Sequence, residues 1–503
     1  MPTVTNPRAL LTALHDAAVQ GAAPFARTRE AVHRWWQEQS LPPAPDVPVY
    51  VVALGKAAPA MAAGAVAALT ELRVAVTDGI VVGAHVPTPR DWHDLPVADL
   101  LRVYVGDHPV PGPNSLLAAE ALEDLLQDME PNALVVVLLS GGTTALCAAP
   151  IAALSQAVGS AEAAQALVAN LAQTLLESGL AIHEMNAIRR RVLRFGAGRL
   201  ATALAARGAQ QIATFAISDV IGDDPSVIGS GPCTPDPLDD ATFLALLDVH
   251  DMRPRLQRAM SQVLGLTGAG TPPSVAHADH PAFARVHYTL VARNADAVNA
   301  LAAAAEREGI HEIHIDDVPL EGDAAALGDL FARRALALSR ALPAGHSALL
   351  VSGGEPVVHL RDTIERAMQA GDDDDARLDE TAAAAPLLIQ PPSAADEPLR
   401  GGRMQVLALS ASLALEAATA RGDRNAWRIT VLAAGTDGRD GPTDAAGAIV
   451  DAAVPALARR SARAPEEDLV TGRTWYSLDA ADALLKTGPT GTNVMDVVAV
   501  LVR

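Results

Sequence analysis

Cysteine is nearly absent from this chain of 503 residues, and its two cysteines, Cys147 and Cys233, lie far apart in the sequence. They form neither a CxxC pair nor a zinc-type spacing, which argues against a disulfide framework and a structural metal site. Aromatic residues make up only 3%, so the cores have to be built from Ala, Val and Leu. Because the first residues also lack a basic segment followed by an apolar one, we expect a protein of the reducing cytoplasm.

Positive charge is scarce as well. The 38 basic residues face 59 acidic ones, which gives a net charge of −21. This balance argues against nucleic acid or an anionic membrane as the main partner, and any anionic substrate has to be met by a local cluster of positive groups. The charge-free segment 131–161 is long enough to span a membrane, but Gly141, Gly142 and Pro150 divide it into shorter pieces.

Several nucleotide-binding motifs are missing. The chain has no GxxxxGK[ST] loop, no protein-kinase motif set and no GxGxxG after its first apolar run. The last absence argues against an enzyme that transfers hydride from a dinucleotide.

Short apolar runs alternate with helical patterns. In the first half this pattern is typical of an α/β domain with a mostly parallel sheet and helices on both faces, and the second half is also α/β. The chain is too long for one ordinary core, so we expect two domains, at 1–280 and 281–503. An acidic segment near 361–385 reads as a solvated insertion. The runs of the first series are 49–54, 79–82, 101–105, 133–139 and 211–217, and those of the second are 286–292, 312–315, 348–351, 429–433 and 497–501.

Four glycine-containing loops stand at expected strand ends. Backbone amides exposed by such loops can bind phosphate. Glycine at a tight turn is commonly a matter of geometry alone, but four loops with hydroxyl or charged neighbours favour phosphoryl binding. The loops are Gly55-Lys56-Ala57, Ser140-Gly141-Gly142-Thr143-Thr144, Ser352-Gly353-Gly354-Glu355 and Gly435-Thr436-Asp437-Gly438.

Lysine is the rarest cation of the chain, since only Lys56 and Lys486 are lysines among the 38 basic residues. A lysine in a Gly-Lys-Ala turn therefore indicates a site that needs a compact ammonium, as a phosphate ligand or to neutralise a transferring group. The alternative is that one of two lysines falls there by chance.

Asp219 follows the run 211–217, at the point where an open α/β sheet binds its ligand. The acidic turn and the Ser230-Gly231-Pro232 loop after it suit an exposed site that handles a cation or a proton, although a solvated turn has the same composition. We expect Asp219 to carry chemistry, and Asp223 and Asp224 either to shape the loop or to approach a cation indirectly.

Arginines supply two further candidate anion sites. Arg403 follows Gly401-Gly402 and opens a helical pattern, which suits a carboxylate or phosphate clamp. A second group could line an anion site or pack against carboxylates, and the pattern does not separate the two. Its members are Arg189, Arg190, Arg191, Arg194 and Arg199.

Taken in order, these segments resemble one family, the class II glycerate kinases, whose C-terminal part is called MOFRL. The resemblance begins at about residue 8 and covers nearly the whole chain. Its further motifs are Gly106-Asp107-His108-Pro109-Val110-Pro111, Ser218-Asp219-Val220, Gly401-Gly402-Arg403, Asp440-Gly441-Pro442-Thr443-Asp444 and Gly488-Pro489-Thr490-Gly491-Thr492-Asn493.

The resemblance implies phosphorylation of D-glycerate, mostly to 2-phosphoglycerate, with ATP and Mg²⁺. It implies a Rossmann-like N-terminal domain, a MOFRL-type α/β domain and an active site in the cleft between them. The sequence leaves the oligomeric state open, with a homodimer as one alternative. Lys56, Asp219 and Arg403 would be catalytic, with Asp219 acting as base or metal ligand. The implied substrate- and nucleotide-binding residues are Gly55, Ser140, Gly141, Gly142, Ser230, Gly231, Ser352, Gly353, Gly354, Glu355, Gly402, Thr436, Asp437, Asp444 and Asn493.

The chain departs from the family pattern at a few positions. Met404 and Met495 stand where asparagines are usual, Arg293 replaces an aspartate, and Gly196 replaces a lysine. A kinase for another small hydroxy acid is therefore an alternative. Two further alternatives are a hydroxypyruvate reductase, a name that members of the family have carried, and a catalytically silent sugar-acid-binding or regulatory protein.

Overall fold

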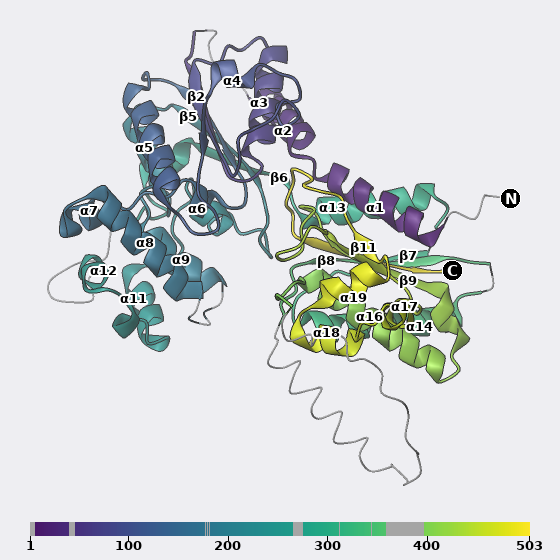
Figure 1. The fold of residues 1–503 in the computed structure, drawn as a ribbon. Helices are drawn as coiled ribbons and strands as arrows, with labels where there is room; N and C mark the ends of the chain where they lie inside the picture. Colours follow the sequence, from purple (N-terminus) through teal and green to yellow (C-terminus); the bar gives the residue numbers. More distant parts are fainter. Residues whose placement is uncertain are drawn as a thin grey trace. The chain divides into compact units, whose positions relative to one another are not determined.

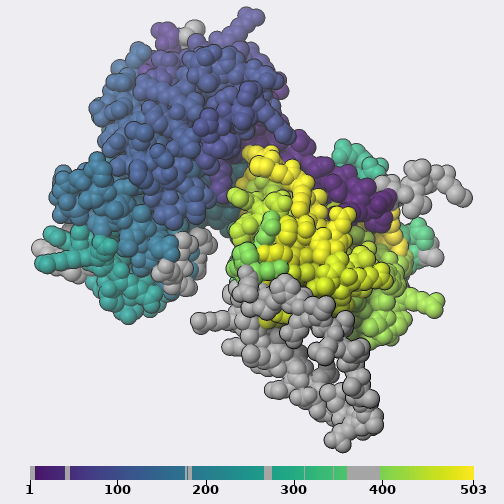
Figure 2. Space-filling model, in the orientation of Figure 1, coloured from purple at the N-terminus to yellow at the C-terminus, as the bar shows by residue number. Residues whose placement is uncertain are grey.

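The computed structural model of the protein describes residues 6–39, 46–176, 178, 180, 182–264, 275–310, 312–343, 345–358 and 397–503. The chain divides into two compact units (Figures 1 and 2). The parallel unit comprises Ala23–Arg293 and Gly491–Asn493, and the mixed unit comprises Met1–Ala22, Asn294–Thr490 and Val494–Arg503. The acidic insertion expected near 361–385 lies outside the described residues.

The parallel unit is built on a six-stranded sheet in the order β3-β2-β1-β4-β5-β6. All its strand pairs are parallel. β1 and β4 are buried along their whole length, and such strands read as unbroken apolar runs because both faces are covered. The strands are β1 (Val49–Leu54), β2 (Asp78–Gly83), β3 (Arg102–Val105), β4 (Leu134–Leu139), β5 (Gln211–Ile217) and β6 (Val286–Ala292).

Helices cover both faces of this sheet. α2 (Pro24–Glu38) and α3 (Ala58–Glu71) pack on one face, and α5 (Pro113–Asp128) and α10 (Arg199–Ala206) share the core of the other (Figure 1). A separate apolar core holds a group of helices beside the sheet. Its members are α7 (Ala152–Val158), α8 (Ala161–Leu176), α9 (Ile182–Val192), α11 (Asp240–Val249) and α12 (Arg258–Val263). The shorter helices of the unit are α4 (Val97–Leu100), α6 (Thr143–Leu146), η1 (Ile228–Ser230), η2 (Arg253–Arg255) and η3 (Pro281–Arg285).

The mixed unit has a second six-stranded sheet, in the order β11-β10-β9-β12-β8-β7. Only β7 and β8 pair in parallel, and the other neighbours are antiparallel. The strands are β7 (Glu312–Ile315), β8 (Ala348–Gly354), β9 (Ile429–Gly435), β10 (Gly447–Val450), β11 (Leu484–Leu485) and β12 (Asp496–Val502). β10 and β11 were not expected from the sequence, because both are short.

Helix layers also enclose this second sheet. α1 (Pro7–Gly21) and α13 (Asn294–Arg307) lie on one face, and α14 (Ala324–Ala341) and α16 (Arg403–Ala420) lie on the other (Figure 1). The remaining elements are η6 (Arg424–Arg428), α17 (Val454–Arg460), α18 (Pro465–Thr471) and α19 (Thr474–Ala480). No helix among the described residues is both long and apolar enough to cross a membrane.

Two segments group differently from the sequence expectation. The run Val286–Ala292, which we expected to begin the second series, instead pairs with β5 as the last strand of the parallel sheet. α1 precedes that sheet in the chain, yet it belongs to the mixed unit. An apolar run or an amphipathic helix fixes its own conformation but does not specify which of two sheets it joins.

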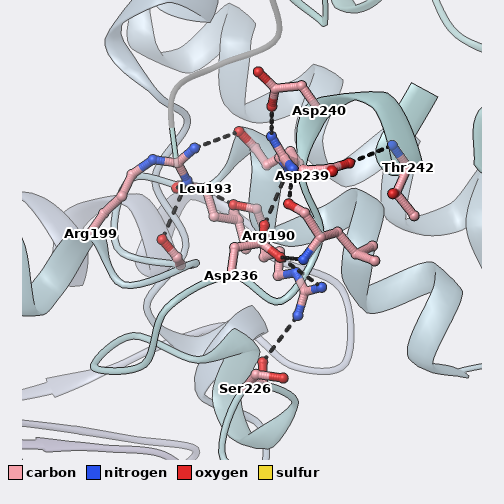
Figure 3. A network of polar contacts seen from close by, with 11 residues as sticks. Arg190, Leu193, Arg199, Ser226, Asp236, Asp239, Asp240 and Thr242 are labelled. Carbon is pink, nitrogen blue, oxygen red and sulfur yellow. Dashed lines mark hydrogen bonds and ion pairs between the residues drawn. The ribbon is translucent and has the colours of Figure 1, made fainter. Parts of the chain in front are cut away.

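A buried ion network supports the helices beside the parallel sheet (Figure 3). Arg190 and Arg191 approach the two carboxylate oxygens of Asp236 at 3.0 and 3.2 Å, and the side chain of Asp236 is 0% exposed. Arg191 also pairs with Asp240 at 2.6 Å. Two buried guanidinium groups thus depend largely on one buried carboxylate for their neutralisation.

We expect Asp236→Asn to destabilise the parallel unit by about 3–5 kcal/mol, because it leaves two buried cations without their shared counter-charge. Denaturant unfolding followed by circular dichroism measures the change. Asp248→Asn is the matched control and should leave the unfolding midpoint close to wild type, since Asp248 forms an exposed ion pair with Arg253. Equal midpoints for the two variants would contradict the assigned role of Asp236.

Candidate active site

The order of the parallel sheet reverses at β1 and β4, because β2 and β3 extend it on one side and β5 and β6 on the other. Open α/β sheets bind ligands outside the carboxyl ends of their strands at such a switch point. Gly55-Lys56-Ala57 follows β1, Ser140–Thr144 follows β4, and Asp219 comes just after β5. Three of the segments selected from the sequence therefore meet at one edge of one sheet.

Hydrogen bonds join the first two of these loops. The backbone N–H of Lys56 donates to the carbonyl of Gly141 at 2.9 Å, and that of Ala57 donates to Oγ of Ser140 at 3.0 Å. A Cβ built on Gly55 would lie 2.3 Å from Oγ of Ser140, and the φ of Gly55 is +123°. Only glycine fits there, so Ser140 and Gly55 shape the site.

The backbone of Gly141 and Gly142 lies against charged side chains. A Cβ built on Gly141 would lie 1.8 Å from Oδ2 of Asp219, and one built on Gly142 would lie 3.2 Å from Cγ of Lys56. Within the described residues, the N–H groups of Gly141, Gly142 and Thr143 donate to no protein acceptor. The loop thus has unpaired amides of its own and lies against the carboxylate of Asp219 and the side chain of Lys56, a set of groups that can bind a phosphoryl group and a cation together.

His108 is a residue near this loop to which the sequence pattern assigned no role. Its Cδ2 would lie 3.3 Å from a Cβ on Gly142. Partial desolvation and the positive charge of Lys56 lower the pKa of His108 to about 4, so the imidazole is neutral at pH 7. The signal in the sequence was the Gly106–Pro111 motif itself, which places a histidine after β3.

The segment after Asp219 frames the site. Asp224 accepts the N–H of Ser226 at 2.8 Å, and Asp223 lies 3.8 Å from Arg293, so both acids hold the turn. Oγ of Ser230 hydrogen-bonds Oγ1 of Thr144 at 2.8 Å, which joins this segment to the loop after β4. Gly231 follows Ser230 with a φ of +59°.

Arg403 belongs to the mixed unit, at the start of α16. Its Nε approaches Oδ2 of Asp496 at 2.5 Å, and its Nη1 lies 2.9 Å from Oε1 of Glu355. Asp496 was missed in the sequence because it stands on a strand among apolar residues. A Cβ built on Gly402 would lie 2.2 Å from Cγ of Asp440, so glycine is required at the beginning of this helix.

Two buried acids accompany Arg403. Burial raises the pKa of Asp440 to about 7 and that of Asp496 to about 6, in both cases against the favourable contribution of Arg403. Asp440 accepts the backbone N–H groups of Met404 and Gln405 at 3.2 and 2.8 Å. Burial lowers the pKa of Arg403, but the carboxylate of Asp496 raises the pKa of Arg403 above its ordinary value, so the guanidinium stays charged.

The other candidates of the mixed unit differ in their surroundings. Ser352 and Gly353 do not form a loop, because both pair with β12 inside the sheet. Thr436 is buried and donates from Oγ1 to the carbonyl of Met495 at 2.7 Å. Asp444 is exposed and contacts cations and an indole, namely Arg400 at 3.2 Å, Lys486 at 3.2 Å and Nε1 of Trp475 at 2.8 Å.

The remaining positions lie as follows. Gly354 ends β8 beside Glu355, and Asp437 follows Thr436 and accepts the N–H of Arg439 at 2.9 Å. Asn493 falls in the short segment that groups with the parallel unit. Met404 is fully buried in the apolar core of the mixed unit, which accounts for an apolar side chain there.

The structure supports a magnesium site only in part. Across the described ranges, no three His, Cys, Asp or Glu side chains are grouped so as to hold a metal. Mg²⁺ is commonly held by one or two carboxylates together with substrate phosphates. The position of Asp219 against the Gly141 backbone fits that mode.

The fold and the site define an α/β protein with a glycine loop at the switch point of a doubly wound sheet. Residues 10–265 match the family described as a domain of unknown function, DUF4147, and residues 395–496 match the MOFRL family. The chain belongs to the class II glycerate kinase family, which combines these two domains.

Relatives match this chain over nearly its full length. The chain is 33% identical to a putative hydroxypyruvate reductase of Agrobacterium vitis, over 98% of this chain and 94% of the relative. It is 30% identical to glycerate 2-kinase of Pyrococcus horikoshii, over 90% and 87% of the two chains. The crystal structure of glycerate kinase from Thermotoga maritima matches with a TM-score of 0.71 at 26% identity, and covers 99% of both chains.

We expect the raised pKa values of the buried acids to appear as a pH dependence of stability. An acid with a raised pKa in the folded state keeps its proton there after the unfolded state has lost its own. The contribution of Asp440 to the free energy of unfolding should therefore fall as pH rises from about 4 to about 7. Thermal unfolding between pH 5 and 8 should show a smaller fall for Asp440→Asn than for wild type.

Asp423→Asn is the control, because hydrogen bonds from Arg340 and Asn425 lower the pKa of Asp423. Its stabilisation is lost only as pH drops below about 4, so the slope between pH 5 and 8 should match wild type. If the stability of Asp440→Asn and that of wild type fall equally between pH 5 and 8, the raised pKa of Asp440 would be contradicted.

Proposed function

We propose that the protein is a glycerate 2-kinase, which transfers a phosphoryl group from ATP to D-glycerate and yields 2-phosphoglycerate. The observation that carries the proposal is the approach of Lys56 and Asp219 to a single loop with unpaired amides at the switch point. Relatives named glycerate 2-kinase over most of the chain support it.

Each residue of the site has a separate role in the proposed phosphoryl transfer. The ammonium of Lys56 neutralises charge that develops on the transferring group, and the amides of Gly141, Gly142 and Thr143 donate to its oxygens. Asp219 either orients and deprotonates the attacking hydroxyl of glycerate or holds a magnesium ion. Magnesium, when bound, supplies charge neutralisation on the phosphates.

Arg403, in the mixed unit, is proposed to bind the anionic substrate or the nucleotide phosphates. Its guanidinium already faces Asp496 and Glu355. These acids fix its orientation, as second partners commonly do for groups that bind ligands. We further propose that the protein works in the cytoplasm, where its buried thiols Cys147 and Cys233 stay reduced, and that it forms a homodimer.

A hydroxypyruvate reductase is the second candidate, because relatives carry that name and the strand order matches that of dinucleotide-binding sheets. However, the first loop of the sheet is Gly55-Lys56-Ala57 and not GxGxxG. A lysine in this loop serves phosphoryl transfer better than hydride transfer. A kinase for another small hydroxy acid is a variant of the same proposal.

We expect the purified chain to release ADP and form phosphoglycerate when given D-glycerate, ATP and Mg²⁺. A coupled assay of ADP release, with the product identified by ³¹P NMR, measures both. Oxidation of NADH with hydroxypyruvate in the absence of ADP release would contradict the kinase and favour the reductase. Neither reaction would favour a binding protein.

Two lysine variants show whether the measured activity belongs to this site. Lys56→Ala should lower turnover by about 10²-fold or more, because a preorganised charge at the transferring group is lost. Lys486→Ala should keep turnover near wild type, since Lys486 lies in exposed ion pairs with Asp444 and Asp479. Equal turnover for Lys56→Ala and wild type would remove Lys56 from the mechanism.

A further inference from the structure

The arginine group at 189–199 in the parallel unit does not act as one surface. Arg190 and Arg191 pair with Asp236, Arg194 pairs with Glu123, and Arg199 donates to the carbonyls of Arg190 and Leu193 at 2.8 and 2.9 Å. Figure 3 shows how Arg190 and Arg199 are held by this network. These four arginines therefore stabilise the fold through protein acceptors and do not line an anion site, the other alternative that the sequence allowed.

Arg189 differs from its neighbours. Its Nε is buried and has no acceptor, and within the described residues its guanidinium makes no hydrogen bond or ion pair. Burial lowers the pKa of Arg189 from its ordinary value, as expected for a cation without a counter-charge. A half-buried guanidinium that stays charged and unpaired costs desolvation free energy unless an anion from solution pairs with it.

Arg189 lines a cavity of about 40 Å³. Other parts of its wall come from Pro109, Thr144, Ala145, Leu171 and Ala172. A water molecule needs roughly 10–15 Å³ of such space, so the cavity holds a group of only a few atoms. Its walls are mostly apolar and its strongest polar group is the guanidinium, which suits a carboxylate on a short carbon chain and not a solvated phosphate chain.

The cavity adjoins the candidate active site through the chain itself. Thr144 and Ala145 directly continue the Ser140–Thr143 loop, and Pro109 directly follows His108. Thr144 is also the residue whose hydroxyl contacts Ser230. A ligand in the cavity therefore lies beside the loop that faces Asp219 and Lys56. Arg403, by contrast, already has two carboxylate partners in the mixed unit.

We propose that this cavity binds the carboxylate of the small hydroxy-acid substrate, and that Arg189 is the residue that pairs with it. The inference rests on the proposed function, because it assigns the acid end of the same substrate. It makes Arg189 a determinant of specificity for acids over neutral polyols, while phosphate is bound at the glycine loops.

Propionate tests the proposal without turnover, because it has a carboxylate but no hydroxyl to phosphorylate. We expect ligand-observed NMR to show that propionate binds the full chain, that propanamide does not, and that D-glycerate displaces propionate. Arg189→Gln should weaken propionate binding by about 10- to 100-fold, the loss typical of a hydrogen-bonded charge pair. Ala172→Leu, which narrows the cavity and leaves the guanidinium in place, should weaken it as well.

Kinetics supply the second measurement. Arg189→Gln should raise the KM for D-glycerate by a similar factor and leave the KM for ATP unchanged, and Arg189→Lys should recover part of the loss. Arg207→Gln is the matched control, because Arg207 is exposed on the same unit. It should behave as wild type in both measurements.

The outcomes separate the two proposals. Wild-type propionate affinity in Arg189→Gln, or failure of wild type to bind propionate, would overturn the carboxylate site whether or not the chain is a kinase. Propionate binding that depends on Arg189 in a chain without ADP release would uphold the site and overturn the kinase. Circular dichroism of Arg189→Gln and Ala172→Leu shows whether each variant remains folded.

Discussion

The candidate site depends on the contact between the carboxylate of Asp219 and the bare backbone of Gly141. Oδ2 of Asp219 occupies the space that any side chain at position 141 would need, 1.8 Å from an ideal Cβ. The carboxylate thus lies against the glycine loop, with Cγ of Lys56 beside the next glycine, Gly142. The chemistry that we propose, which needs a cation, a carboxylate and oxyanion donors within a few ångströms, follows from that one packing constraint.

The rest of the parallel unit holds the contact in place. The reversal of strand order brings the ends of β1, β4 and β5 together, and the bond from Lys56 N–H to Gly141 fixes the two loops. The segment after Asp219 is anchored from the helical side, where Arg190 donates to the carbonyl of Ser226 at 3.3 Å and Ala197 donates to that of Ser230 at 2.9 Å. The buried charges around Asp236 thus support the segment that follows Asp219.

Much of this could be predicted from the sequence, and the failures share a cause. Buried parallel strands and their glycine loops are local signals, so β1, β4 and β5 and the loop residues Lys56 and Asp219 were found. β6, α1 and the strand position of Ser352 depend on partners distant in the chain. For the same reason, composition and spacing did not predict that Arg403 pairs with Asp496. They also did not predict that Arg189 is unpaired while its four neighbouring arginines have partners.

We infer that Asp219 takes its place in the reaction because position 141 carries no side chain. The most direct test is the ADP-release rate of Gly141→Ala with D-glycerate, compared with Gly83→Ala, where an added Cβ meets nothing closer than 3.4 Å. We predict a loss of about 10²-fold or more for Gly141→Ala, because displacement of a catalytic group by about 1 Å has that effect, and near wild-type rates for Gly83→Ala. Equal rates in a folded Gly141→Ala variant would contradict the account.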